Sequence, residues 1–406
     1  MRSKEKIFIG VVLFYITCLF FPVITGLLHI PVWFPSIVVS VTLLAMYPKV
    51  VLRNKTFYWL MLYFLVVFLF ISFGRTVKLD IGRGSSYAQL IIEYAFLLPN
   101  VIICLVLLYL NDYRIVTILG KSFVILLIFS FIVLIPQLRY VDLRAMAIKS
   151  LLDDSSTNEY IFINYTLLHV YVFLIPVFYY CCVKIDGLFK RLSIVLLLML
   201  IYIVFRSNIT TCLIIGIVTL SLSVVISSRN KAKTTIYFLL FFSVVMVLYK
   251  SGAFVSLLNA VRPLFEGTAV ELKIDDALDL LSTGQTSGSI EARENLHQIS
   301  RDGFYSNIIL GSGRAGGHSS ILDRLATMGL VGFIPYFMIY YTIVSQFVKR
   351  LDRFSKRYYY LDVFSVVVIL YTKGIFGQEG NLVFMVLVPV LLLLPEHIKT
   401  KAALSS

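Results

Sequence analysis

The chain has 406 residues, of which 59% are apolar and only 14% are charged. Apolar runs of about 18 or more residues recur along it, which excludes a soluble globular domain and predicts an integral membrane protein. The net charge of +14 does not indicate nucleic-acid binding, because the basic residues stand in short clusters between apolar runs. We therefore expect an all-α integral membrane protein with no nucleic-acid partner.

The apolar segments predict about twelve membrane-spanning helices. Their expected ranges are 7–28, 31–47, 57–73, 88–110, 115–136, 160–183, 188–205, 209–227, 234–249, 320–347, 358–373 and 381–395. Arg2, Lys4 and Lys6 precede the first range, as the basic region of a signal peptide would. Because this range is long and no small-residue cleavage site follows it, we expect a retained membrane anchor.

Basic residues are concentrated in alternate loops between the predicted helices. Clusters occur at 49–55, 184–191, 229–233 and 349–357, and further basic residues lie near both ends of the chain. Short cytoplasmic loops carry an excess of Lys and Arg. We therefore expect both termini on the cytoplasmic side, which agrees with an even number of crossings.

The longest connection between predicted spans would lie on the opposite, extracytoplasmic side. It is too long for a simple connector within a compact bundle. Ser289 is positioned to cap a helix inside it, and this helix would place Arg293 and His297 on one face. The chain thus divides into an N-terminal bundle of nine spans (1–249), the extracytoplasmic loop (250–319) and a C-terminal segment of three spans (320–406).

The most polar and glycine-dense segment is residues 311–320, Gly-Ser-Gly-Arg-Ala-Gly-Gly-His-Ser-Ser. Its glycines allow tight turns and let backbone N–H groups approach a ligand closely. Ser320, with Asp323 three residues later, predicts a helix that begins at the next residue. Arg314 and His318 would precede the positive end of the helix dipole, which favours a diphosphate or a carboxylate. A flexible loop that enters a membrane helix is the alternative interpretation.

Arginine and histidine gather on the predicted outer side. Charge at the edge of the hydrocarbon is unfavourable, so Arg206 at the end of the seventh span is a functional candidate, although contact with lipid headgroups would also explain it. Arginine binds phosphate oxygens bidentately, which suits a lipid-linked phosphate or diphosphate. The candidate residues are Arg206, Arg293, His297, Arg314 and His318, with Arg75 and Arg83 as possible additions.

The sequence lacks the known motifs for ATP hydrolysis, zinc proteolysis and serine hydrolysis. It has no Walker loop, no HExxH, no GxSxG and no Cys/His spacing typical of a metal site. We therefore expect no metal and no cofactor.

One motif resembles a known superfamily. His318-Ser319, nine further residues and Gly329-Leu-Val-Gly332 are similar to the signature of the bacterial O-antigen ligases and the Wzy-type O-antigen and capsule polymerases. The Gly311-Ser-Gly313 step and an arginine on a preceding loop helix, here Arg293, also fit. Arg206 matches the family's span-ending arginine only in part, because Phe205 stands where the family has serine. The resemblance is specific over about residues 289–335 and architectural elsewhere.

The resemblance implies a metal-independent glycosyltransferase in the bacterial cytoplasmic membrane. Its substrate would be an oligosaccharide linked to undecaprenyl diphosphate, and its partners would be membrane lipids and a flippase and chain-length regulator of the same pathway. Arg206 and Arg293 would bind the diphosphates, and His318 would act on the acceptor hydroxyl or a phosphate oxygen. The residues expected to contribute to diphosphate and sugar binding are Arg83, His297, Arg314, Gly316, Gly317, Ser319 and Ser320.

Three functions fit these observations. The first is a repeat-unit polymerase of a capsule or O-antigen pathway, and the second is a ligase that uses a different acceptor. The third is a flippase for lipid-linked oligosaccharides, which would show two related halves and charges spread over many spans. Because the charge here is concentrated in one outward loop, the polymerase is the preferred interpretation.

Overall fold

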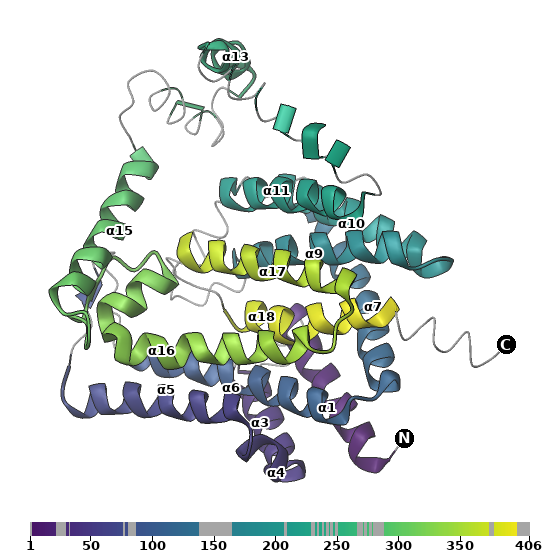
Figure 1. Cartoon of the computed structure of the whole chain (residues 1–406), viewed down its shortest axis with the longest axis vertical. Coiled ribbons are helices and arrows are strands. Elements are labelled where there is room, and N and C mark those ends of the chain that lie inside the picture. Colours follow the sequence, from purple (N-terminus) through teal and green to yellow (C-terminus); the bar gives the residue numbers. More distant parts are fainter. Residues whose placement is uncertain are drawn as a thin grey trace.

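The computed structural model describes most of the chain, and its helices lie side by side in a bundle (Figure 1). The described residues are 2–21, 30–31, 33–75, 78–79, 87–137, 165–206, 209–228, 251–265, 288–372 and 377–395, with isolated residues between 232 and 278. Within them the structure is helical apart from turns and one short strand pairing, in which β1 (Lys78–Leu79) runs parallel to β2 (Arg314–Ala315).

The helices follow the predicted apolar segments. Their bounds are α1 (Ser3–Phe20), α3 (Phe34–Met46), α4 (Pro48–Leu52), α5 (Lys55–Ser72), α6 (Tyr87–Leu110), α7 (Tyr113–Gln137), α9 (Tyr165–Lys184), α10 (Leu188–Arg206), α11 (Thr210–Ser227), α13 (Ala253–Val261), α15 (Gly288–Ser306), α16 (Ser320–Val348), α17 (Arg353–Thr372) and α18 (Gly377–Leu382). Two short turns complete the set, a 3₁₀ turn (Arg262–Phe265) and a π-helical turn (Val383–Leu387).

Six of the helical segments within the described residues are long and apolar enough to cross a membrane. They are 55–72, 113–135, 167–184, 188–206, 320–348 and 377–395, and three shorter apolar helices cover 34–46, 95–110 and 211–227. The prediction of an all-α membrane protein is thereby confirmed. Of the expected ninth span (234–249), only isolated residues are described.

Side-chain contacts fix the direction of the helices. The Gln346 amide donates to Thr56 Oγ1 at 2.9 Å, so the end of α16 lies beside the start of α5. At the other end, the Arg75 guanidinium just after α5 donates to the carbonyl of Leu310 at 2.7 Å, close to the start of α16. These two helices are therefore antiparallel. We name the end of the bundle where α5 finishes and α16 begins the loop end.

The helices α9, α10 and α17 extend the same arrangement. The Tyr180 and Ser355 hydroxyls are 2.7 Å apart, which places the last turns of α9 beside the first turn of α17. Since α17 follows α16 after a short turn, α17 finishes at the loop end and α9 begins there. A short turn around Gly187, with φ of +77°, reverses the chain into α10. Arg206, the last residue of α10, consequently lies at the loop end.

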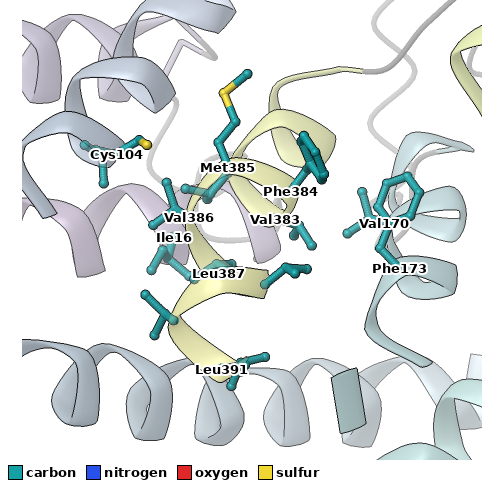
Figure 2. Packing of buried hydrophobic residues seen from close by; sticks show 14 of the residues in the cluster. Ile16, Cys104, Val170, Phe173, Val383, Phe384, Met385, Val386, Leu387 and Leu391 are labelled. Atoms are coloured by element: carbon teal, nitrogen blue, oxygen red, sulfur yellow. The ribbon is translucent and has the colours of Figure 1, made fainter. Parts of the chain in front are cut away.

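The centre of the bundle is formed by the most thoroughly buried spans. Within an 18-residue stretch of each span, 89% of the residues are buried in 377–395 and 78% in 167–184, whereas only 28% are buried in 188–206. Figure 2 shows residues 383–387 between Ile16 and Cys104 on one side and Val170 and Phe173 on the other. A helix that is apolar all round suits such a central position, and the outer helices expose apolar side chains where lipid would contact them.

The last span begins at Gly377, earlier than the expected range of 381–395. Hydropathy missed its first turn because that turn is polar. Gln378 is buried, and its amide donates to Tyr15 Oη at 2.8 Å and also to the hydroxyl of Ser36. The side-chain amide of Asn100 donates to the Gln378 carbonyl at 3.3 Å. Partners on α1, α3 and α6 therefore accept from or donate to the Gln378 side-chain NH₂ and main-chain carbonyl, polar groups that hydropathy alone would exclude from a span.

The expected loop of residues 250–319 contains helices of its own. Helix α15 confirms the predicted loop helix, although it begins at Gly288, so Ser289 lies inside the first turn and not before it. Figure 1 shows α15 at one side of the molecule and the start of α1 toward the opposite side. Helix α15 thus lies at the loop end of the bundle.

Candidate functional site

The polar helix α15 carries a stripe of basic side chains. Arg293, His297 and Arg301 follow one another at steps of four residues, which brings them onto one face. Arg293 and Arg301 are exposed and His297 is half-buried. Arg301 was not among the predicted site residues, although the same spacing that joined Arg293 to His297 identifies it.

The structure brings the two predicted histidines together. The His297 and His318 rings have centroids 6.1 Å apart, and the ring of Tyr371 lies 5.6 Å from that of His297. Three segments meet here: α15, the glycine-rich loop and the last turn of α17. Sequence reasoning missed Tyr371, because no local pattern links the end of a membrane helix to a loop helix about seventy residues earlier.

Glycines allow the loop to lie directly against α15. Gly316 faces the backbone of Leu296, and a Cβ at this glycine would overlap the Leu296 carbonyl group. Gly303 on α15 faces the Arg314 carbonyl oxygen in the same way. Only glycine permits two backbones to approach so closely. The glycine-rich loop is therefore packed and is not a flexible entry to the next helix.

The N–H groups of this loop donate within the protein. Gly316 N–H donates to Ser300 Oγ at 2.8 Å. Gly317 N–H and Ser319 N–H donate to the two carboxylate oxygens of Asp323 at 3.2 and 2.9 Å. The predicted cradle of free N–H groups for a diphosphate is thus corrected, because these donors already have protein acceptors. Any anion bound here must be held mainly by side chains.

The start of α16 lies one residue earlier than predicted. Ser319 has extended backbone angles and its hydroxyl accepts from Leu322 N–H at 3.2 Å, so Ser319 is the N-cap and Ser320 is the first helical residue. Asp323 completes the capping pair by accepting from the N–H of Ser319 itself. Either serine can cap a helix, so the sequence alone could not decide between Ser319 and Ser320.

The glycine pair of the His-Ser-x₉-Gly-x-x-Gly motif has a structural explanation. Gly329 has φ of +58° and ψ of −159°, which breaks α16 in a region of backbone space that only glycine readily adopts. A Cβ there would overlap the Ile309 carbonyl oxygen. Gly332, one turn later, lies against the side chain of Met328.

Residues 308–313, which include the start of the glycine-rich loop, form hydrogen bonds with backbone groups on both sides of this break. The Ala326 carbonyl accepts from Ser312 N–H at 2.8 Å and from Gly313 N–H at 3.2 Å. Leu330 N–H donates to the Ile308 carbonyl at 2.9 Å. The backbone of the opened helix therefore bonds to the loop, and the loop is anchored to α16.

Two arginines near the loop hold structure. The Arg75 guanidinium donates to the carbonyls of Leu310 and Gly311 at 2.7 and 2.6 Å and lies 4.7 Å from the Phe70 ring. Buried Arg324 donates to the Ser320 carbonyl at 2.9 Å and lies 3.9 Å from the Tyr336 ring. Arg75, considered above as a possible anion ligand, is assigned to anchoring the loop, because both terminal nitrogens donate to backbone.

The other predicted arginines differ in what the structure places. Arg206 and Arg314 are exposed, Arg206 at the loop-end terminus of α10 and Arg314 in β2, opposite Lys78. Arg83 lies outside the described residues. The positively charged candidates that the structure describes therefore share one end of the bundle with the histidine pair.

The His297 imidazole is suited to accept a proton. Burial lowers its pKa below the ordinary value of 6.5; nearby Asp323 opposes this effect, and Arg301 and Arg293 add to it. Its Nε2 atom is buried and has no hydrogen-bond partner among the described residues. At neutral pH this histidine is consequently neutral, and its ring can take up a proton from a group that enters the site.

No model of a known protein family matches the chain, and no curated protein sequence matches it. The relation to the O-antigen ligases and polymerases thus remains a resemblance carried by residues 289–335.

Proposed function

We propose that this protein is a glycosyltransferase that polymerises a polysaccharide from oligosaccharides linked to undecaprenyl diphosphate, in capsule or O-antigen synthesis. The observation that carries this proposal is the pairing of His297 with His318, whose ring centroids are 6.1 Å apart. Helix α15, which carries His297, also presents the exposed Arg293. Groups for proton transfer thus stand beside groups that bind phosphate, at the end of a membrane bundle.

The proposal includes a topology. About twelve spans cross the bacterial cytoplasmic membrane, both termini are cytoplasmic, and residues 250–319 lie outside between a bundle of nine spans and one of three. The basic clusters between alternate helices support this orientation. The shared direction of α9 and α16, opposite to that of α5, α10 and α17, fits the expected alternation of crossings. A polyprenyl lipid would then reach the loop end from the outer leaflet.

The reaction is a displacement at the anomeric carbon of the donor sugar. The acceptor hydroxyl oxygen forms the new glycosidic bond, and the bond between the anomeric carbon and the diphosphate oxygen breaks. The bonding electrons leave with undecaprenyl diphosphate, and the hydroxyl proton passes to a neutral imidazole. Because the leaving group departs with negative charge, the protein must mainly neutralise that charge and align the hydroxyl.

The residues divide between these two tasks. His318 orients or deprotonates the acceptor hydroxyl, and His297 beside it supplies a neutral imidazole. Arg293 and Arg206 bind the diphosphates of the two lipid-linked substrates, because the guanidinium fork matches phosphate oxygens and stays charged. Arg314, exposed on the loop that carries His318, contributes to the same anion binding. No metal or cofactor takes part in this scheme.

The test uses the full-length protein in lipid nanodiscs and two probes. The first is lipid-linked oligosaccharide extracted from the host cells, with product length read on a gel. The second is radiolabelled undecaprenyl diphosphate, with retention by the protein measured directly. A ladder of products and saturable retention are expected. If the same protein in sealed liposomes instead moves the oligosaccharide across the bilayer, without any growth in its length, the polymerase proposal is wrong and a flippase takes its place.

A further inference from the structure

The carboxylate of Asp323 grips the backbone on both sides of His318. Gly317 N–H donates to one of its oxygens at 3.2 Å, and Ser319 N–H donates to the other at 2.9 Å. These N–H groups belong to the residues on either side of the histidine. The backbone position of His318 is therefore defined by a single side chain on α16.

Ser300 joins this carboxylate to α15. Its hydroxyl donates to Asp323 Oδ1 at 2.6 Å and accepts from Gly316 N–H at 2.8 Å, and the side chain is only 1% exposed. Ser300 lies less than one turn after His297 on the same helix. One chain of hydrogen bonds thus connects the backbone that bears the first histidine with the loop that bears the second.

An ordinary helix cap does not account for this arrangement. Capping needs only the Ser319 hydroxyl on Leu322 N–H and the Asp323 oxygen on Ser319 N–H. The bonds from Ser300 and from Gly317 lie outside α16 and add nothing to its first turn. They connect three separate segments beside the two imidazoles, in a partly buried setting in which bonds to a carboxylate are strong.

We propose that Asp323 and Ser300 are positioning residues that set the separation and orientation of His297 and His318. For its effect on catalysis this inference rests on the proposed function, but the geometry that it describes can be tested without any activity. We call these hydrogen bonds of Asp323 and Ser300 the clamp. The clamp acts through the backbone around His318, so its loss should release the histidine while the membrane bundle stays folded.

The experiment compares matched variants of the full chain in nanodiscs. Ser300→Thr keeps the hydroxyl, and Ser300→Val has the same shape without it. Asp323→Asn removes the charge and one acceptor at the other end of the bond. Asp302→Asn makes the same chemical change at an exposed position two residues after Ser300 and serves as the control.

The first readout is modification of each histidine by diethyl pyrocarbonate, followed by mass spectrometry. Loss of a bond to a carboxylate corresponds to roughly a tenfold to hundredfold increase in local opening. We expect His297 and His318 to react about tenfold faster in Ser300→Val and Asp323→Asn than in Ser300→Thr and Asp302→Asn. Buried His169 on α9 should react equally slowly in all of them, which excludes general unfolding.

The second readout is polymer formation, as turnover and as the substrate concentration at half-maximal rate. A positioning role predicts a fall in turnover by about tenfold or more with an unchanged half-maximal concentration, and recovery in Ser300→Thr. Equal histidine modification in the Thr and Val variants would overturn the clamp. Absence of polymer from the wild-type protein would instead overturn the proposed function, and the modification result would still decide the clamp.

Discussion

The exposed Arg293 separates anion binding from folding. Arg293→Ala should abolish long polymer and lower the retention of undecaprenyl diphosphate, while thermal unfolding stays unchanged because the side chain is exposed. Arg293→Lys should restore little, since an ammonium group cannot reproduce the bidentate fork. Arg353→Ala, an exposed arginine at the opposite end of the bundle, is the matched control. Normal polymer from the Arg293→Ala protein would remove this residue from the site.

His318 distinguishes proton transfer from charge neutralisation. If the imidazole handles the acceptor hydroxyl, His318→Arg should lose about 10²–10⁴-fold in rate and still retain undecaprenyl diphosphate, because the added guanidinium supplies positive charge. If the imidazole only holds a phosphate, the arginine should support substantial polymer formation. An active His318→Arg protein would therefore contradict the acceptor-side role and leave a purely electrostatic site.

His297 predicts a pH dependence with a defined sign. Burial lowers its pKa below 6.5 in the folded chain, so below pH 6.5 the unfolded chain binds this proton more readily. The contribution of neutral His297 to stability is complete above that pH and is lost as the pH falls toward the lowered pKa. When the pH is lowered from about 8 to about 5, the thermal unfolding temperature of the wild type should fall more than that of His297→Gln. Parallel curves for the two proteins would contradict this prediction.

The broken helix α16 can be tested by adding a single methyl group. Gly329→Ala forces a side chain onto a backbone at φ of +58° and against the Ile309 carbonyl, so the protein should lose roughly 2–4 kcal/mol of stability. Gly10 on α1 has no atom within 4 Å of an added Cβ, and Gly10→Ala should stabilise by up to about 1 kcal/mol. Thermal unfolding of the two purified variants in detergent measures the difference. Equal stabilities would mean that the helix does not need to open at Gly329.

Several element boundaries could be read from the sequence, and others could not. Apolar length identified the six helices that are long enough to cross a membrane, since a bilayer demands about 20 apolar residues whatever they contact. The polar start of α18 was missed because Gln378 is buried by Tyr15 and Ser36, which lie more than 300 positions earlier. Tertiary partners of this kind leave no trace in a local pattern.

The candidate site was predictable in its residues and less so in their tasks. Spacing alone placed Arg293 and His297 on one face, and the motif singled out His318. The sequence could not show that the loop N–H groups donate to Asp323 and Ser300, because α15 and α16 meet through glycine-mediated backbone contact. Tyr371 joins the histidines only through the way that α17 returns to the loop end.

At the scale of the whole molecule, orientation is the property to test. Single cysteines at Ser251 and Ser312, both exposed, should react with a membrane-impermeant thiol reagent in intact cells, whereas one at Lys349 should react only after permeabilisation. Four of the five native cysteines are buried, so the background should be low. Labelling of Lys349→Cys from outside, with protection of the other two, would invert the topology.

The break at Gly329 fixes both the distance and the rotation between the N-cap of α16 and the point where the helix opens. Nine residues separate Ser319 from Gly329, which corresponds to two and a half turns and about 14 Å along the axis. Each residue inserted between Asp323 and Ala326 would rotate the cap by about 100° relative to the break. Asp323 would then point away from Ser300 while the Ala326 carbonyl still faced Ser312. The fixed count in the motif is thus a requirement of angular phase, and an insertion should disable the site even though it lengthens the helix by only about 1.5 Å.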